Sequence, residues 1–232
     1  MNYQFPNRSV VIKLGGSIIH PEDINTPYIK EFKEFIEKNV EEKKKFVIVA
    51  GGGQLARKFQ LASKEIKSEL TQEEADWIGI HATRLNAQLL RTVLANITDP
   101  IVIHRRFKIK FRQYPVTISS GWTPGNSTDH IAAILAKDFK TKVFIVAGKP
   151  EYMYDKDPSK YKTAKPYKKL TWDEYIEMTP SEWTPGIHVP IDPVAARFAK
   201  KHKLTAIIIG GKDLKNLSNL IEGKDFSGTI ID

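Results

Sequence analysis

The sequence predicts an α/β fold, a three-layer α/β/α sandwich around a mainly parallel central sheet. Short, continuous apolar runs rich in β-branched residues alternate along the chain with longer segments of helical period. Continuous apolar strands are typical of parallel sheets that are covered on both faces, and parallel neighbours need long crossover connections. Glycine follows several of these runs directly, as expected where a buried strand ends in a tight turn.

The first half of the chain supplies two strands and three helices to this prediction. Strands are predicted over residues 10–14 and 46–50, and the second is ended by three glycines. A helix over residues 26–39 has apolar residues at i, i+3 and i+4, and a second helix follows the glycines. Their apolar positions are Tyr28, Ile29, Phe32, Phe35 and Ile36 in the first, and Leu55, Phe59, Leu61, Ala62 and Ile66 in the second. Thr71 and Glu74 form a capping box that begins a long helix to about residue 95.

The second half continues the alternation. Strands are predicted over residues 101–103, 116–119, 142–147 and 205–209, and residues 228–231 end the chain as an edge strand. Helices are predicted over residues 131–137, capped by Ser127 or Thr128, and over residues 193–203. Because no Pro/Ser-rich linker, repeat or low-complexity tract interrupts the chain, residues 1–232 are predicted to form one domain. Two lobes, about 1–140 and 141–232, are expected to meet near residue 140.

Composition excludes several classes of protein. The chain has no cysteine, which rules out a disulfide scaffold, a cysteine zinc site, a thiolate nucleophile and cysteine-ligated iron–sulfur clusters. Lys and Arg number 36 against 27 Asp and Glu, and the net charge of +9 suggests an anionic partner. Nucleic acid, a membrane surface and phosphorylated small molecules all fit that charge. No apolar run is long enough to cross a membrane, and the first residues do not resemble a signal peptide.

Lys13 lies within the first predicted strand and is followed by Leu14, Gly15 and Gly16. The glycines permit a sharp turn and the close backbone approach that phosphate binding requires. Burial of an unpaired ammonium group is costly, so a lysine in an apolar strand needs an explanation. Two interpretations stay open at this point: Lys13 serves a ligand at the strand end, or it lies at a sheet edge and extends to solvent.

Residues 51–57 place three glycines before a helix that carries Arg57. Consecutive glycines can form a nest of backbone N–H groups for an anion, and Arg57 can complete a phosphate clamp. The alternatives are a plain strand–helix turn and a dinucleotide-binding fold. The second is disfavoured because no strand end with an acidic residue follows about 20 residues later. The Walker motif is absent from the sequence.

Residues 121–129 form a third loop after a predicted strand. Gly121, Pro124 and Gly125 favour turns, and Ser127 and Thr128 end the loop at a helix start. Hydroxyl groups at this position either cap the helix or bind a phosphate, and the helix dipole favours an anion there.

These three loops, in this order, resemble those of the amino acid kinase superfamily, and within it the archaeal-type uridylate (UMP) kinase branch. The resemblance extends from about residue 9 to residue 231, and the ordered set of motifs is more specific than any single motif. The matching segments are residues 12–17, 51–58, 76–87, 127–129 with Ala132 and Ala133, 154–158, 169–171, 191–196 and 228–229.

The resemblance implies a transferase that moves the γ-phosphoryl group of ATP to UMP, with Mg²⁺ as cofactor, and gives UDP and ADP for pyrimidine biosynthesis. It also implies a cytoplasmic homo-oligomer, commonly a hexamer in the family, with no membrane or nucleic-acid partner. No metal-ligand residues are assigned.

The resemblance also implies roles for individual residues. Lys13 would neutralise the transferring phosphoryl group, Gly15 and Gly16 would line its path, and Asp129 and Asp192 would orient Lys13 or the metal. The residues implied for UMP are Gly52, Gly53 and Arg57 at the phosphate, Asp76 at the ribose, and Gly125, Asn126 and Thr128 at the base and phosphate. The residues implied for ATP are Lys149, Tyr154 and Asp157. Without the resemblance, Asp192 is also a good helix N-cap before Pro193, Asp76 a first-turn dipole residue and Tyr154 a packing residue.

Two departures from the family pattern affect these expectations. Where the family's nucleotide loop usually has Asp-Gly, this chain has Glu151 and Tyr152, and Pro150 removes a backbone donor. We therefore expect an altered course or a weaker hold on ATP in residues 149–154. Trp122 is expected near the acceptor base, which leaves the acceptor open to another small phosphate.

Three functions are compatible with the sequence: a nucleoside monophosphate kinase, a catalytically altered relative, and a nucleic-acid-binding module. The altered relative would bind nucleotide or store oxyanions, as the molybdenum storage proteins do. The nucleic-acid module rests on net charge alone and requires steeply salt-dependent affinity. The ordered motifs favour the kinase.

Overall fold

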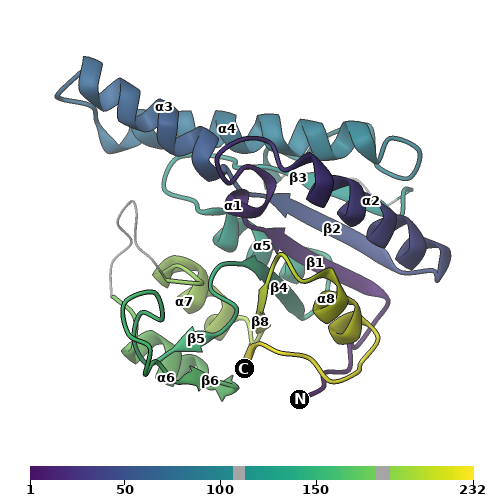
Figure 1. Cartoon of the computed structure of the whole chain (residues 1–232). Coiled ribbons are helices and arrows are strands. Elements are labelled where there is room, and N and C mark those ends of the chain that lie inside the picture. The colour runs from purple at the N-terminus through teal and green to yellow at the C-terminus, as the bar shows by residue number, and fades with distance from the viewer. Residues whose placement is uncertain (107–112, 181–188) are drawn as a thin grey trace.

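The computed structural model describes residues 1–106, 113–180 and 189–232 (Figure 1). Its main sheet contains seven strands in the order β3-β2-β1-β4-β8-β9-β7, within the described residues. These strands are β1 (Ser9–Leu14), β2 (Lys45–Ala50), β3 (Val116–Ser119), β4 (Val143–Gly148), β7 (Lys169–Leu170), β8 (Thr205–Gly210) and β9 (Thr229–Ile231). Only the β8–β9 pair is antiparallel, so the predicted mainly parallel sheet is confirmed.

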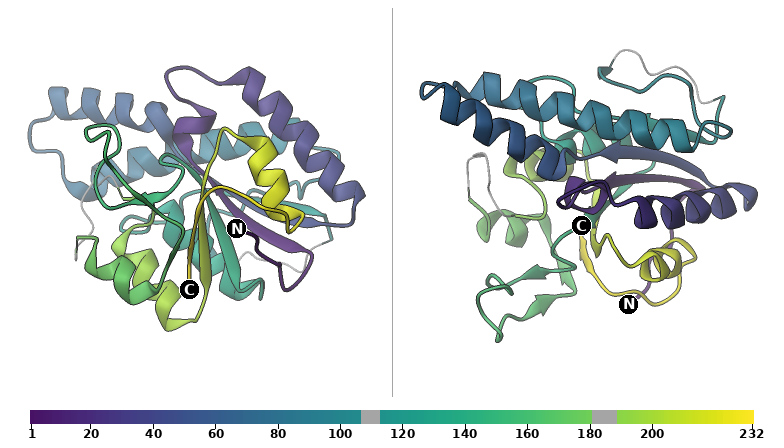
Figure 2. Two further views of the ribbon diagram at one scale, coloured as in Figure 1. Left: turned by 60° about the horizontal axis from the view of Figure 1, so that its bottom comes forward. Right: turned by 45° about the horizontal axis from the view of Figure 1, so that its top comes forward.

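Helices cover both faces of this sheet, and Figure 2 shows α8 and α6–α7 on opposite sides of it. The helices are α1 (Gly16–Ile19), α2 (Thr26–Glu41), α3 (Gly53–Ile66), α4 (Gln72–Val93), α5 (Thr128–Asp138), α6 (Trp172–Glu177), α7 (Pro193–Lys201) and α8 (Leu214–Ile221). Outside the sheet, β5 (Met153–Tyr154) and β6 (Pro166–Tyr167) form a separate antiparallel hairpin. The three-layer α/β/α prediction is therefore confirmed.

The alternation of side chains along β1 divides the core into two clusters. Val10, Ile12 and Leu14 face the cluster that contains residues of α2, α4 and α8. Val11 faces the other cluster, which contains residues of α5, α6 and α7. Since successive side chains of a strand point to opposite faces, Lys13 lies on the same face as Val11, toward α5.

The sequence predicted most long elements within a few residues of their ends. α4 begins with the predicted capping box, in which Thr71 and Glu74 each bind the other's backbone N–H. Ser127, one of the two predicted caps, is the N-cap of α5. The prediction of a terminal edge strand is wrong, because β9 lies between β8 and β7.

The predicted strand over residues 101–103 is also wrong. Only Ile103 forms an isolated bridge, with Ser119. Asp99 explains the difference, because its side chain accepts a hydrogen bond from the N–H of Ile101 at 2.9 Å. This local turn competes with strand pairing and leaves Ile101 54% exposed.

Helix α3 forms as predicted, but its apolar residues are largely exposed. Ala56 is its one buried residue. Phe59 is 59% exposed, Leu61 65% and Ile66 87%. α3 and α4 run beside each other across the top of the molecule in Figure 1, and Leu85 of α4 is 62% exposed. Exposed apolar residues on this pair of helices are therefore Phe59, Leu61, Ile66 and Leu85.

Candidate active site

Lys13 lies in the middle of the sheet, because β1 pairs with β2 on one side and with β4 on the other. The edge-strand interpretation of this lysine is therefore wrong. Its side chain is 16% exposed, and its Nζ lies 2.9 Å from Oδ1 of Asp129. The ion pair with Asp129 explains how an ammonium group is tolerated in an apolar strand.

Asp129 and Asp192 reach this position from the first turns of two neighbouring helices. Asp129 lies in the first turn of α5, and Asp192 is the N-cap of α7. Oδ1 of Asp192 accepts hydrogen bonds from the N–H groups of Val194 at 2.8 Å and Ala195 at 3.0 Å. Its Oδ2 accepts a short hydrogen bond from the hydroxyl of Ser127. Asp192 therefore caps α7 and also belongs to the cluster around Lys13.

Burial affects the protonation of Asp129. Asp129 is 8% exposed and Asp192 is 3% exposed. Burial raises the pKa of Asp129, Lys13 opposes that rise, and the nearby Asp192 carboxylate adds to it. We conclude that the pKa of Asp129 lies above its ordinary value of 3.8, with desolvation as the main cause.

The raised pKa predicts the acid side of the pH–rate profile. As the pH falls through the pKa of Asp129, the carboxylate is protonated and no longer holds Lys13, so kcat should fall at a pH above 3.8. The control is His130→Gln, because burial lowers the pKa of His130, which is the next residue of α5. The acid limb should stay in place in this variant. The prediction would be contradicted if the acid limb of the kcat profile moved in His130→Gln, or if it lay at or below pH 3.8 in wild type.

The two glycine turns lie against each other at the carboxyl ends of β1 and β2. A Cβ on Gly16 would lie 1.9 Å from the backbone nitrogen of Gly53. Gly53 has a φ of +66°, which side chains other than glycine rarely adopt. Gly15 donates its N–H to the carbonyl of Ala147 at 2.8 Å, which ties the first turn to β4. Gly15, Gly16, Gly52 and Gly53 are therefore brought together beside Lys13, at the edge where such sheets bind ligands. Arg57, one turn further along α3, is exposed.

Helix α4 holds the loop of residues 121–128, here called the acceptor loop, at two positions. Oδ2 of Asp76 accepts a hydrogen bond from the N–H of Gly125 at 2.8 Å. The hydroxyl of Thr83 accepts one from the N–H of Gly121 at 2.7 Å. Asp76 is the fifth residue of α4, beyond the first turn, so its interpretation as a first-turn dipole residue is wrong. It fixes the loop that contains the predicted acceptor residues.

The other acceptor-loop residues lie at or near the start of α5. Thr128 is its first residue, and the amide of Asn126 is fixed between His130 at 2.9 Å and the hydroxyl of Thr123 at 2.9 Å. Trp122 lies near the start of the same loop. It is 6% exposed, belongs to the core cluster around α5, and donates its indole N–H to Ser119 at 3.2 Å. Its indole ring is therefore packed in the core.

The Asp76 contact gives a second prediction. Asp76→Ala should raise the KM for the acceptor that the resemblance implies, UMP, about tenfold, because a hydrogen bond to a charged group contributes about 1.5–3 kcal/mol. The matched control is Asp99→Ala, which also removes a carboxylate–backbone hydrogen bond in a loop but lies outside the candidate site. Steady-state kinetics and urea unfolding of both variants test the prediction. An equal rise in KM for both variants would contradict it.

The residues expected at ATP lie further along the chain. Lys149 is exposed after β4, and Tyr154 lies in β5, with its ring 5.9 Å from that of Tyr152. Asp157 accepts hydrogen bonds from the N–H and hydroxyl of Ser159. These contacts of Asp157 lie within its own turn, where Nζ of Lys160 is also 4.0 Å from its Oδ2.

In residues 149–154, whose sequence departs from the family pattern, the peptide bond between Lys149 and Pro150 is cis. None of them has a positive φ. The N–H of Met153 donates to the buried hydroxyl of Thr229 at 2.9 Å, which connects the hairpin to β9. The altered loop is thus tied to the main sheet without the left-handed residue that a glycine would permit.

Comparison with known proteins identifies the family. A model of the amino acid kinase family matches residues 8–210. The chain belongs to the amino acid kinase family. Within this family, the uridylate kinase of Thermococcus kodakarensis is 34% identical over 228 residues, which cover 96% of this chain and 99% of the relative. The uridylate kinase of Methanococcus aeolicus is 35% identical over 230 residues, with 96% and 98% covered.

Solved structures of amino acid kinases agree. The crystal structure of uridylate kinase from Archaeoglobus fulgidus superposes with a TM-score of 0.80 at 32% identity, covering 96% of this chain and 99% of that chain. The UMP kinase of Ureaplasma parvum has a TM-score of 0.77 at 22% identity and 97% and 98% coverage, which supports the fold alone. The predicted resemblance is therefore confirmed at the level of family and fold.

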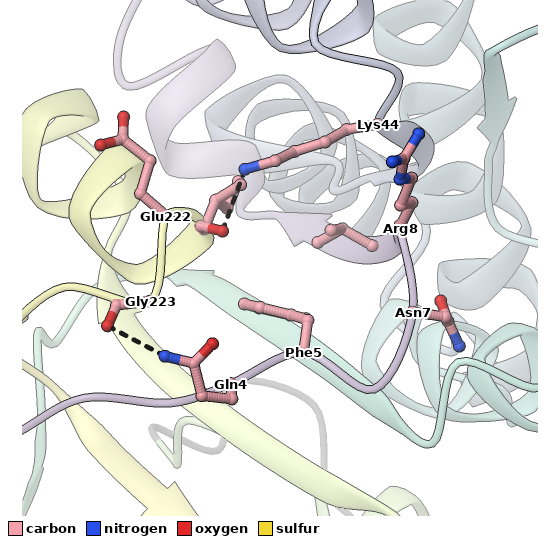
Figure 3. A pocket seen from close by; sticks show the side chains of 9 residues that line it. Gln4, Phe5, Asn7, Arg8, Lys44, Glu222 and Gly223 are labelled. Atoms are coloured by element: carbon pink, nitrogen blue, oxygen red, sulfur yellow. Dashed lines mark hydrogen bonds between the residues drawn. The ribbon is translucent and has the colours of Figure 1, made fainter.

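One cavity lies away from the Lys13 cluster, and none of the predicted site residues lines it (Figure 3). It measures about 280 Å³ and lies between the N-terminal segment and the end of α8. Lys44 donates to the carbonyl of Ile221 there at 3.0 Å, and burial lowers the pKa of this lysine. Lys44 thus stabilises the carboxyl end of α8.

Sequence reasoning missed the contributions of Thr83 and Asn86 of α4. Both are buried, Thr83 at 7% exposure and Asn86 at 2%. They lie on the side of α4 that also buries Ile80, Ala87 and Leu90. Polar residues on an otherwise apolar helix face were the available signal, since a buried polar group requires a partner.

Proposed function

We propose that this amino acid kinase transfers the γ-phosphoryl group of ATP to UMP and forms UDP and ADP. The observation that carries the proposal is Lys13, held by Asp129 at 2.9 Å, at the strand end beside two glycine turns. The relatives named uridylate kinase, which match almost the full length of this chain, support UMP as the acceptor.

The chemistry follows from the charges of the reactants. An oxygen of the UMP phosphate attacks the γ-phosphorus of ATP, and the bond from that phosphorus to the bridging oxygen breaks. ADP leaves with the bonding electron pair. Because the attacking phosphate is already ionised, no general base is needed, and catalysis consists of positioning and charge neutralisation. The ammonium of Lys13 supplies a positive charge for the transferring group.

The remaining assignments extend the same proposal. Gly52, Gly53 and Arg57 hold the UMP phosphate, while Asp76, Gly125, Asn126 and Thr128 contribute to ribose, base and phosphate binding. Gly15 and Gly16 line the phosphoryl path, and Lys149, Tyr154 and Asp157 contact the adenine nucleotide. In this arrangement, residues 1–140 form the acceptor lobe and residues 141–232 the ATP lobe.

Mg²⁺ fits this donor set as a companion of ATP. It favours carboxylate and phosphate oxygens and keeps few protein ligands. Asp129 and Asp192 are the carboxylates beside Lys13, and the described residues contain no group of three or more side chains suited to hold a metal alone. Bound Mg²⁺ would offset phosphate charge, with ATP providing most of its ligands.

We also propose that the protein forms a homo-oligomer in the cytoplasm, where its nucleotide substrates would be found. The exposed Phe59, Leu61, Ile66 and Leu85 support an interface between copies on α3 and α4, because such apolar surfaces are typical of association sites. Light scattering after gel filtration measures the oligomeric state. None of the described helices is long and apolar enough to cross a membrane.

A coupled assay of ADP release tests the activity across UMP, CMP and other small phosphates. Turnover with UMP, well above that with the others, is expected. The altered sequence of residues 149–154 favours one second candidate, a relative that binds nucleotide without transfer. If calorimetry showed binding of ATP and UMP but the assay showed no turnover, the protein would be that relative. If neither binding nor turnover were found, the kinase proposal would be refuted.

A further inference from the structure

Asn86 connects the middle of α4 to the glycine turn of residues 51–53. Its side-chain amide donates to the carbonyl of Gly51 at 2.8 Å and to the carbonyl of Gly52 at 3.1 Å. The side chain is 2% exposed, so both contacts are shielded from water. An asparagine at this depth needs partners, and it finds them in the two successive carbonyls of one turn.

Holding a carbonyl also fixes the direction of an N–H group. A trans peptide unit is planar, and its C=O and N–H bonds point in opposite directions. The carbonyl of Gly51 shares a peptide unit with the N–H of Gly52, and the carbonyl of Gly52 shares one with the N–H of Gly53. Asn86 therefore turns both N–H groups away from α4.

These two N–H groups have no hydrogen-bond acceptor among the described residues. Among the described residues, neither Gly52 nor Gly53 donates a hydrogen bond from its N–H, whereas the next residue, Gln54, donates to the carbonyl of His20 at 2.9 Å. Gly52 is the N-cap of α3 and Gly53 is its first residue, and the helix dipole favours an anion at this end. Glycines have the widest backbone freedom, so without an external restraint this turn would sample many orientations.

We propose that Asn86 is a positioning residue that aims the N–H groups of Gly52 and Gly53 at the phosphate of the acceptor. The identity of that phosphate as UMP rests on the proposed function. The positioning itself follows from the two hydrogen bonds and the planarity of the peptide unit.

The test uses Asn86→Asp, which keeps the shape of the side chain but replaces the donor with an acceptor, and Asn86→Leu, which removes both. The matched control is Gln88→Leu, which removes an exposed amide from the same helix. The KM values for UMP and for ATP are measured on the full chain, together with thermal unfolding. We expect KM for UMP to rise about tenfold or more in both Asn86 variants, with KM for ATP changed less than about twofold.

A second readout needs no turnover. The chain has 14 glycines, so NMR spectra of protein labelled only at glycine resolve few signals. In wild type, the amide signals of Gly52 and Gly53 should move on addition of UMP or inorganic phosphate. The same titration should move them much less in the Asn86 variants.

The outcomes separate this inference from the kinase proposal. An unchanged KM for UMP in a folded Asn86 variant would overturn the inference, as would parallel rises of both KM values that follow a loss of stability. The inference would also be overturned if neither UMP nor inorganic phosphate moved the amide signals of Gly52 and Gly53 in wild type. If wild type shows no turnover with UMP but inorganic phosphate still moves these signals through Asn86, the kinase proposal fails and the positioning role stands.

Discussion

Replacing Lys13 with methionine should lower kcat for UMP phosphorylation by about a thousandfold, the upper range for loss of one preorganised charge in an active site. The methionine keeps most of the apolar stem inside the sheet and removes only the ammonium group. Without it, the carboxylate of Asp129 loses its ion-pair partner, so its pKa should rise further and the carboxyl group should become neutral. The fold should survive because the carboxyl can take up a proton.

The matched control is Lys45→Met at the exposed start of the neighbouring strand β2. This variant should keep kcat within about twofold, because surface charges away from a site contribute little. Calorimetry with UMP should show binding close to wild type in Lys13→Met, since the glycine turns are unchanged. A variant that keeps more than a tenth of the wild-type kcat would remove Lys13 from the proposed mechanism.

Lys13 also illustrates what the sequence could predict about the site. A lysine in a run of Val10, Val11 and Ile12 conflicts with burial, and that conflict left two interpretations open, a ligand at the strand end or a sheet-edge position. Strand order then excluded the edge position, because β1 is central. Strand order depends on long-range pairing, which a local pattern does not contain.

The contacts of α4 could not be predicted in the same way. Asn86 and Thr83 are polar residues within a regular helical pattern, and their contacts with the glycine turn and the acceptor loop join them to backbone groups about 35 residues away or more. A sequence pattern shows side chains but gives no direction for a carbonyl or an N–H group in another segment. The roles of Gly51, Gly52 and Gly121 in these contacts therefore required the structure.

The shortest strands also could not be predicted from the sequence. β5, β6 and β7 have two residues each, too few to show a period of two. Their positions depend on partners such as the hydroxyl of Thr229, which binds Met153 and Tyr167. By contrast, the six-residue strands β1, β2, β4 and β8 are continuous apolar runs, and all four were predicted.

Gly16→Ala should be the most damaging of the conservative substitutions in the two glycine turns. The added methyl group would lie 1.9 Å from the nitrogen of Gly53 and 2.6 Å from the carbonyl carbon of Gly52. Both are backbone atoms, so the clash cannot be relieved by rotating a side chain, and the two turns must move apart. We expect a loss of about 3 kcal/mol in the free energy of unfolding, the upper range for overpacking, and loss of measurable UMP binding.

Gly148→Ala is the matched control, because a Cβ at Gly148, which ends the neighbouring strand β4, meets nothing within 4 Å. Its free energy of unfolding should stay within about 0.5 kcal/mol of wild type. Urea unfolding and UMP calorimetry on both variants measure the contrast. If Gly16→Ala bound UMP as wild type does, close contact of the two turns would not be required for the phosphate site, and Gly52 and Gly53 would have to bind it independently of β1.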